Sequence, residues 1–499
     1  MTHLDSTHTD VQPAPGENAS TGVAAGTPSP WPVFWVAAIA VFLVAMDGTM
    51  LFAAFSALRA GFADATPADL SWVLNAYTVV YAAMLIPAGG LADRHGRKKV
   101  FLAGVWLFVG ASVGCGLAGS VEWLVAARVA QAIGAALLTP ASLSLVLAAF
   151  PITKRAVAVS LWGAVGGLAA AVGPSLGSFV VASLGWQWAF YLNVPLGVFA
   201  LWRGTRLLTE TKQQTEGRPL DLVGMGLLVV GIGALALSLV QSESPAWSRQ
   251  ALLGALGIGL ACLIGFVVWA RSTAAPLVDL RLFHNRTYSY VNLATLSFGI
   301  AFSMMFFAFF FYMSAIWRYP LPLAGLAMMP GPLLVVPTAA LSGRVASRYG
   351  HRPLLLIGCL VYAMSGLWFL LVPGHEPAYL TQWLPGMVLS GVGVGLVMPS
   401  LAGAAVSRLS ADHYAVGGAI NQAIRQIGSV MGVALTVLLL GSPSLQRADF
   451  DPVYLCHIAL ALLTAALCLP VNTLTGASSF RVPNGTENTS AEGRSEDFP

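Results

Sequence analysis

Residues 89–99 read GGLADRHGRKK, and residues 343–353 read GRVASRYGHRP. Each stretch follows a long apolar segment, opens on glycine, carries a second glycine seven residues later and is rich in arginine. Short basic turns between apolar segments are typical of connections between helices that cross a membrane. The two copies begin 254 residues apart (343 − 89), which predicts an internal repeat built from membrane-spanning helices.

The composition supports a membrane protein. The chain has 499 residues, of which 57% are hydrophobic and 9% charged, with a mean hydropathy of +0.75. Soluble domains carry roughly 25% charged residues. We therefore predict an all-α integral membrane protein with about fourteen spans, each near the length needed to cross the hydrocarbon. The predicted spans are 33–55, 71–91, 100–119, 122–149, 157–183, 187–207, 221–241, 250–270, 289–315, 323–343, 354–373, 382–406, 416–440 and 453–475.

The distribution of lysine and arginine predicts the orientation. An even number of spans puts both polar tails, 1–31 and 476–499, on one side of the membrane, and most basic loop residues lie on that side. Both tails are therefore expected to be disordered and to lie on the cytoplasmic side. The protein itself is expected in the inner (cell) membrane of a bacterium. The net charge of +4 follows from this topology and needs no nucleic-acid partner.

The spacing of the repeat predicts the domain organisation. An offset of 254 residues spans eight predicted helices, which fits two six-helix halves with an extra helix pair between them. We expect an N-terminal half at 32–207, an inserted segment at 208–271 and a C-terminal half at 272–475. Parallel halves related about the membrane normal are one of the repeat plans of transporters. The inserted pair has no charged residue within the membrane and is expected to be peripheral.

Asp47 lies in the middle of the first apolar segment, and no other acidic residue falls well inside a predicted span. A carboxylate in the bilayer is costly, and such residues usually mark a proton or cation pathway. Arg128 is also placed at membrane depth and needs an acceptor. We therefore predict that Asp47 and Arg128 meet across a central cavity and couple transport to protons. The alternative is a static structural pair.

A second candidate device lies on the cytoplasmic side. A carboxylate at Asp93 can stabilise a helix N-terminus or pair with arginine, and so hold the two halves closed on that side. The alternative is that the basic residues only anchor the topology. The predicted cytoplasmic gate comprises Gly89, Asp93, Arg94, Gly96 and Arg97.

The walls of the predicted cavity are apolar and aromatic, which suits amphipathic cargo. Aromatic residues are also common on lipid-facing helices, so each of them has that alternative. The candidates are Phe52, Tyr77, Tyr81, Gln131, Trp162, Asn193, Phe306, Phe310 and Tyr312. Arg425, four residues after Asn421, is interpreted as mainly structural. Gly173 and Pro174 are expected to kink the fifth span at a helix contact, with Gly177 on the same helix.

These motifs resemble those of the major facilitator superfamily, and more closely its fourteen-helix drug:proton antiporter branch of the EmrB and QacA type. Residues 89–98 match the pattern G-x-L-A-D-R-x-G-R-K at every fixed position. Arg128, Gln131 and Gly134 match R-x-x-Q-x-x-G, and residues 173–177 match G-P-x-x-G, which the family associates with antiport. The resemblance has exceptions: Ser347 replaces the acid in the second copy, and Phe52 stands where the branch usually has asparagine.

The function that these features predict is proton-coupled multidrug efflux by alternating access. The sequence has no phosphate-binding loop and no zinc-protease motif, so we expect no enzyme activity, no cofactor and no metal. The proton gradient is the available energy source, and the single deep acid favours neutral or monocationic cargo. The expected partners are a small molecule, protons and the lipid bilayer, with the chain as a monomer. Alternatives are a dedicated exporter of one metabolite or antibiotic, a proton-coupled importer, or a non-transporting sensor or channel.

Overall fold

The computed structural model describes residues 29–62, 65, 67–211, 221–241, 247–274, 276–409, 414–440 and 445–473. All regular secondary structure in these ranges is helical, as the sequence predicts. Twelve helices there are long and apolar enough to cross a membrane. The other two predicted spans correspond to one shorter apolar helix and to a helix interrupted near Leu192. The count of fourteen therefore holds approximately.

The N-terminal half contains seven helices that together account for six of the predicted spans. The fourth begins after Ser120, whose side chain accepts a hydrogen bond from the Trp123 amide and caps the helix. The helices are α1 (Trp31–Gly61), α2 (Pro67–His95), α3 (Arg97–Gly116), α4 (Val121–Ala149), α5 (Ile152–Leu184), α6 (Trp188–Tyr191) and α7 (Asn193–Leu207).

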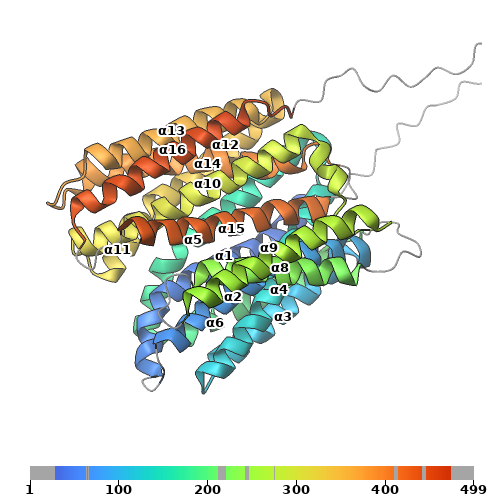
Figure 1. Cartoon of the computed structure of the whole chain (residues 1–499), viewed down its shortest axis with the longest axis horizontal. Coiled ribbons are helices and arrows are strands. Elements are labelled where there is room, and N and C mark those ends of the chain that lie inside the picture. Colours follow the sequence, from blue (N-terminus) through green and yellow to red (C-terminus); the bar gives the residue numbers. More distant parts are fainter. Residues whose placement is uncertain are drawn as a thin grey trace, which may run out of the picture.

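The C-terminal half repeats this pattern. Its helices are α10 (Arg286–Phe311), α11 (Leu321–Met328), α12 (Pro330–Tyr349), α13 (Arg352–Leu371), α14 (Leu384–Val406), α15 (Tyr414–Leu440) and α16 (Asp451–Cys468). Short helical turns join some of them: η1 (Leu280–His284), η2 (Tyr312–Ile316), η3 (Tyr379–Trp383) and η5 (Arg447–Phe450). Figure 1 shows this half above the N-terminal half, with α5 and α15 between them.

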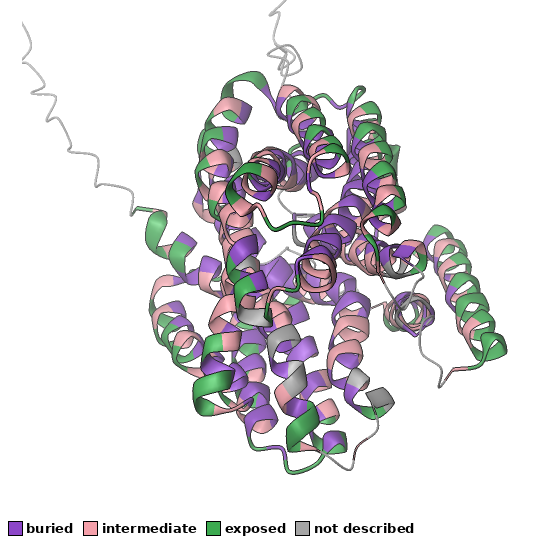
Figure 2. Cartoon of the chain, turned by 90° about the vertical axis from the view of Figure 1, so that its left-hand side faces the viewer, coloured by how far each residue is buried: buried purple, intermediate pink, exposed green. Residues whose placement is uncertain are grey.

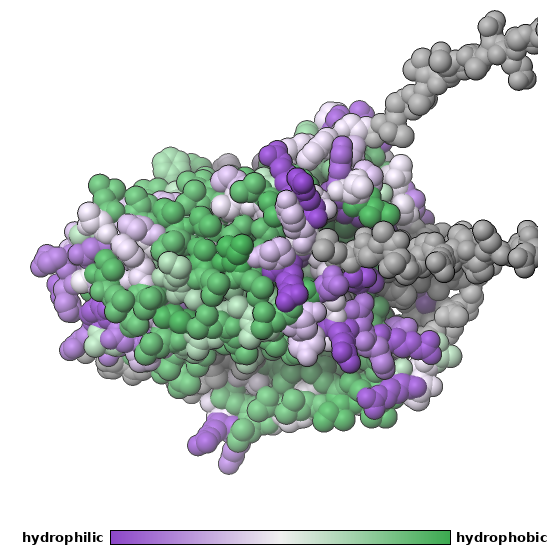
Figure 3. Space-filling view, turned by 90° about the horizontal axis from the view of Figure 1, so that it is seen from above, coloured by the Kyte–Doolittle hydropathy of each residue, from purple (hydrophilic) through white to green (hydrophobic). Residues whose placement is uncertain are grey.

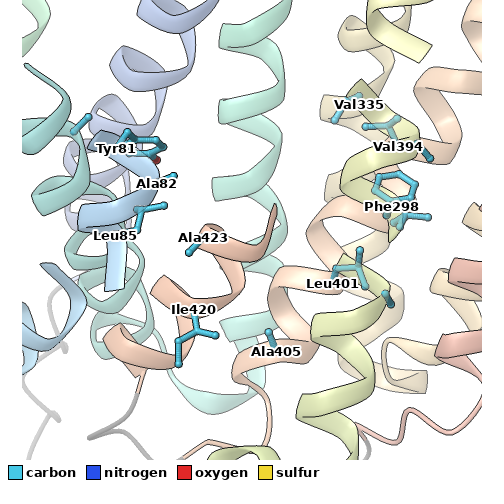
Figure 4. Close-up of a cluster of buried hydrophobic side chains, with 14 of the residues drawn as sticks. Tyr81, Ala82, Leu85, Phe298, Val335, Val394, Leu401, Ala405, Ile420 and Ala423 are labelled. Atoms are coloured by element: carbon cyan, nitrogen blue, oxygen red, sulfur yellow. The ribbon is translucent and has the colours of Figure 1, made fainter. Parts of the chain in front are cut away.

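The two halves meet along two pairs of helices. On one side α2 packs against α15, and on the other α5 packs against α12. Figure 4 shows the first contact region, where Tyr81 and Leu85 of α2 lie near Ala423 and Ile420 of α15. The central cavity lies between these two seams.

The predicted extra pair is α8 (Leu222–Val240) and α9 (Arg249–Ser272). The helix α8 packs against α2 and also contacts α15, so it lies along one seam between the halves. Only 11% of the most apolar 18-residue stretch of α9 is buried. This helix lies at the edge of the bundle (Figure 2). Asp221 fixes the pair at one end, because its carboxylate accepts hydrogen bonds from the Gly224 and Leu277 amides and from Trp269 Nε1.

The surface has the pattern of a membrane protein. On the face that Figure 3 shows, a broad apolar area occupies the middle of the molecule, and hydrophilic residues gather at its two ends. The first and last described residues of the chain lie on one of these two sides: Trp31 packs edge-to-face against Phe150, and the Asn472 carbonyl accepts a hydrogen bond from Arg408. We call this end the terminal side.

The turn between α2 and α3 is shorter than the sequence predicts. The helix α2 continues to His95 and α3 begins at Arg97, so most of the motif is helical and Gly96 alone makes the turn. Its φ of +109° is favourable only for glycine. The second copy uses Gly350 in the same way, with a φ of +76°, and these two glycines are again 254 residues apart (350 − 96).

Candidate functional site

The centre of the site is the carboxylate of Asp47 on α1, which is 1% exposed. Arg128 Nη1 donates to Oδ2 at 2.6 Å, while Gln131 Nε2 and Asn193 Nδ2 each donate to Oδ1 at 2.9 Å. The helices α4 and α7 therefore supply three donors to an acid on α1. Buried charges are tolerated only when they are paired and hydrogen-bonded in this way.

Further contacts hold the donors in place. Arg128 Nε donates to the Val73 carbonyl at 3.1 Å, and the guanidinium lies 4.0 Å from the centre of the Tyr77 ring. Gln131 Nε2 also donates to Ser112 Oγ at 2.8 Å. The guanidinium, the amide and the carboxylate are thus fixed relative to one another by three helices besides α1.

Small residues bring α5 close to α1 beside this acid. A Cβ atom at Gly173 would overlap Thr49 Oγ1, and one at Gly177 would lie 3.1 Å from the Met50 carbonyl oxygen. Pro174 lies inside α5, which remains one continuous helix. The predicted G-P-x-x-G segment therefore forms the contact between α5 and the helix that carries Asp47.

A cavity of about 320 Å³ lies next to the acid, between the two halves. Arg128 lines it, as do Gly48 and Thr49, the two residues that follow Asp47 on α1, whereas Asp47 itself does not. The carboxylate is therefore separated from the cavity by its arginine partner. A smaller chamber of about 50 Å³ shares Gly167, Ala170, Phe302 and Met398 with the cavity.

The predicted cavity residues differ in whether they line the main cavity, line the smaller chamber or pack against Asp47. Tyr77, Tyr81 and Trp162 line the main cavity, and Phe306 lines the smaller chamber. Gln131 and Asn193, predicted to face cargo, are fully buried against Asp47 instead. The helical register of α4 and α7 turns both side chains toward α1.

The remaining predicted residues do not line the cavity in the described part of the chain. Tyr312 belongs to an aromatic cluster with Trp317, Trp383 and Phe450, because the π-helical turn η2 directs it away from the centre. Phe310 borders neither described chamber. The side chain of Phe52 lies outside the described residues.

The interpretation of Arg425 as mainly structural needs correction. Arg425 lines the main cavity together with Asn421, Gln422 and Gln426 of α15. The sequence signal was present, since polar residues at 421, 422, 425 and 426 follow helical spacing and predict one polar stripe. Four large polar side chains on one helix at membrane depth indicate a surface that is accessible to water.

One of the predicted gate residues, Asp93, forms a contact between the halves on the terminal side. Asp93 Oδ1 accepts from Arg97 Nη2 at 2.9 Å, and Asp93 Oδ2 accepts from the Val416 amide in the first turn of α15 at 3.1 Å. Nearby, Arg155 Nη1 donates to Tyr414 Oη at 2.6 Å. The carboxylate of the N-terminal half thus lies at the helix N-terminus of the other half, where negative charge is favourable.

The other gate residues have different environments. Gly96 forms the turn, and Gly89 is buried within α2. Arg94 is half-buried and makes no hydrogen bond or ion pair with the described residues. Glu210 was not predicted: its carboxylate accepts hydrogen bonds from the Lys98 and Lys99 amides, both at 3.1 Å, and caps α3. An exposed glutamate beyond the end of a span gave no signal in the sequence.

Paired halves, a membrane-embedded ion pair and a cavity between the halves define a membrane transporter. The model of the Major Facilitator Superfamily matches residues 37–433, and the chain belongs to this family.

Two relatives and one solved structure illustrate the similarity. The chain is 30% identical over 436 residues to the tetracenomycin C resistance and export protein of Streptomyces glaucescens, covering 87% of this chain and 80% of that protein. It is 30% identical over 413 residues to the multidrug export protein EmrB of Haemophilus influenzae, covering 80% and 78%. The crystal structure of the human organic anion transporter MFSD10 matches with a TM-score of 0.64 and 15% identity, covering 89% of this chain and all of that one. This last similarity concerns the fold alone.

Proposed function

We propose that this protein is a proton-coupled efflux antiporter of the drug:proton branch, which exports amphipathic small molecules by alternating access. The single observation that carries the proposal is the set of hydrogen bonds that hold the buried carboxylate of Asp47. Asp47 is the only acidic side chain deep within the described helices, and it is held by three donors beside a cavity that both halves line. The relatives whose names contain export support the direction of transport.

The coupling follows from competition for the carboxylate. In the described state Arg128 and two amides satisfy the charge of Asp47, so the acid needs no proton. When the halves rock and the cavity opens to the acidic side, α1 and α4 shift and weaken this pairing, and Asp47 takes up a proton. An intramembrane carboxylate is neutral and inexpensive once protonated. The proton is released when the pairing forms again on the other side.

The direction of the cycle follows from the proposed orientation. With the terminal side in the bacterial cytoplasm, the contacts Asp93–Val416 and Arg155–Tyr414 close the cytoplasmic end. The G-P-x-x-G contact between α5 and α1 keeps this helix interface tight during the exchange, as the family pattern implies for antiport. The chain is proposed to work as a monomer, since one copy contains the cavity and the contacts that close the terminal side.

The test is transport in proteoliposomes with an imposed pH gradient. Wild type should move a fluorescent amphipath and protons in opposite directions, and Asp47→Asn should lose the coupled proton flux while remaining folded. Asp69→Asn is the matched control, because that acid is exposed near the start of α2 and should leave transport unchanged. Coupled transport that persists in Asp47→Asn would refute the proposed role.

A dedicated exporter of one metabolite remains the second candidate. It shares the fold, the acid and the coupling. The breadth of cargo accepted by the reconstituted wild type separates it from a multidrug pump, because a dedicated exporter moves one chemical scaffold only.

A further inference from the structure

The charge of the central cavity points to a class of cargo. Two arginines line it, and the charge of Arg128 is compensated by Asp47 at 2.6 Å. Arg425 has no such compensation: among the described residues it makes one side-chain hydrogen bond, from Nε to Gln422 Oε1 at 2.7 Å, and no ion pair. No carboxylate is found among the described residues that line the cavity. The lining therefore carries net positive charge.

Comparison with the other arginines shows that Arg425 is unusual. Arg128 uses its guanidinium on Asp47, Gln131 and the Val73 carbonyl. Arg155 bonds the Phe150 carbonyl and Tyr414, and Arg447 bonds Asp451 and two backbone carbonyls. Each of these three arginines bonds at least two protein acceptors. The two Nη groups of Arg425 have no acceptor among the described residues, although the residue lines a cavity.

The neighbours of Arg425 are suited to a polar acceptor. Asn421, Gln422, Gln426 and Ser429 of α15 lie along the same wall, and Thr295 of α10 lies beside them. The amides of Gln422 and Gln426 can donate hydrogen bonds around an anion that the guanidinium attracts, whereas Asn421 and Thr295 already donate to other protein groups. A planar guanidinium with free N–H groups matches the two oxygens of a carboxylate.

The second chamber defines the other end of the cargo. It is lined almost entirely by apolar residues from α5, α10, α11, α12, α13 and α14, including Phe306, Phe309, Met305, Met328 and Met387. Methionine and phenylalanine form adaptable surfaces that pack well against aromatic rings. Since this chamber shares four lining residues with the main cavity, one molecule can reach both.

We propose that the cargo of this transporter is an organic anion with an apolar ring body, whose acidic group binds Arg425 and whose rings enter the methionine- and phenylalanine-lined chamber. This inference rests on the proposed export function and replaces the neutral or monocationic cargo that the sequence suggests. An anion also suits a cavity in which a cation would face the uncompensated Arg425 and find no carboxylate among the described lining residues, because Asp47 lies behind Arg128 and is paired with it.

The test uses three probes with one ring system and different charge. Naphthoate is an anion, naphthylmethanol is neutral, and naphthylmethylamine is a cation at neutral pH. Binding to the purified full-length protein, in nanodiscs of phosphatidylcholine, is measured by quenching of tryptophan fluorescence. We expect wild type to bind naphthoate at least roughly tenfold more tightly than the ammonium probe, because one charge-assisted pair differs between them. Equal binding, or tighter binding of the cation, would overturn the proposal without any variant.

Variants assign the preference to Arg425. Arg425→Gln should lower the affinity for naphthoate by roughly tenfold and leave naphthylmethanol nearly unchanged, and Arg425→Lys should retain part of the preference. Arg408→Gln is the control, since this exposed arginine does not line the cavity. An unchanged affinity for naphthoate in folded Arg425→Gln would contradict the assignment.

Two further arms separate this proposal from others. Adding phosphatidylglycerol should leave the preference for naphthoate intact; its disappearance would mean that a lipid headgroup is the natural occupant, which refutes an anionic cargo. Asp47→Asn should still bind naphthoate while losing proton-coupled transport. If Asp47→Asn keeps coupled transport, the proposed coupling fails, whereas the binding order of the three probes still decides the cargo class.

Discussion

Asp47 shows how a single acid can be tolerated and kept functional within a membrane. Its two carboxylate oxygens receive donors from Arg128, Gln131 and Asn193, so the charge is compensated on both sides. The sequence could predict the pair with Arg128, because only one deep acid and few deep arginines exist. It could not predict the two amides, because their direction depends on the rotation of α4 and α7 about their axes.

Removing one amide donor tests this set of hydrogen bonds. Gln131→Leu should destabilise the protein by about 1–3 kcal/mol, because the buried carboxylate loses a donor that a leucine cannot replace. Transport should also fall. Thermal melting in detergent and proteoliposome flux measure the two effects. Ser144→Ala is the matched control on α4, since its buried hydroxyl has no hydrogen-bond partner among the described residues. A Gln131→Leu variant as stable as this control would contradict the interpretation.

His351, in the turn between α12 and α13, is expected to make stability depend on pH. It is 4% exposed, and burial lowers its pKa from 6.5 to about 4. Between these values the unfolded chain binds a proton and the folded chain does not. Folding is therefore favoured above pH 6.5, and the advantage, about 3 kcal/mol at most, is lost progressively as the pH falls toward 4.

Melting temperatures across this pH range measure the effect. The fall in melting temperature on acidification should be smaller in His351→Asn than in wild type, because the variant has no imidazole to protonate at this position. His284→Asn, which changes an exposed histidine, should follow the wild-type curve. Parallel curves for all three proteins would show that His351 does not control this dependence.

At the scale of elements, glycine positions decide how closely helices approach. The sequence predicts a kink at a helix contact for Gly173 and Pro174. The structure shows the contact, because the glycines of the continuous helix α5 lie against the backbone of α1, while the kink stays a prediction. The sequence also could not predict that Gly96 alone forms the turn. Polar residues such as Asp93 and Arg94 are typical of loops, and only their contacts show that they belong to a helix. Hydropathy locates a helix within the membrane and cannot show how far it extends beyond it.

The contact between α5 and α1 can be tested with one methyl group. Gly173→Ala should destabilise the protein by about 1–3 kcal/mol, because the new Cβ overlaps Thr49 Oγ1 and forces the helices apart. Gly163→Ala on the same helix is the control, since its Cβ would meet nothing closer than 3.7 Å. Gly173→Ala should therefore lower the melting temperature more than Gly163→Ala does. Equal decreases would show that the close contact between α5 and α1 does not limit the stability of the protein.

At the scale of the whole molecule, the repeat predicted the two halves, because an offset of 254 residues leaves room for two additional helices. The sequence also suggested that the added pair is peripheral, and the small buried share of α9 agrees with this. The position of α8 against α2 and α15 could not be predicted. Nothing in an apolar sequence distinguishes a face that contacts protein from one that contacts lipid.

The contact of Asp93 with α15 should control opening of the terminal side. Asp93→Asn removes the negative charge at the helix N-terminus, so the open state should become more populated, by roughly two- to fivefold. A cysteine replacing Thr139, which lines the cavity, reports this in a chain whose five native cysteines are replaced. Labelling by a membrane-impermeant maleimide from the terminal side should be faster in Asp93→Asn.

Arg94→Gln provides the matched comparison for this labelling experiment. This neighbouring arginine makes no hydrogen bond or ion pair with the part of the chain that the structure describes, so its removal should leave the labelling rate unchanged. Equal rates for Asp93→Asn and Arg94→Gln would show that the carboxylate does not hold the two halves together.

The position of α8 makes the two flanks of the transporter unequal toward the lipid. Along the α2–α15 seam, α8 and then α9 lie outside the junction, whereas along the α5–α12 seam the described residues place the short helix α11, which contacts both partners. A compound that partitions into the bilayer before transport is separated from the α2–α15 seam by two further long helices. At the α5–α12 seam no such long pair of described helices lies in its way. We therefore expect loading from the leaflet to be easier on this second flank, so that neighbouring proteins in a crowded membrane should affect transport mainly when they lie against that flank.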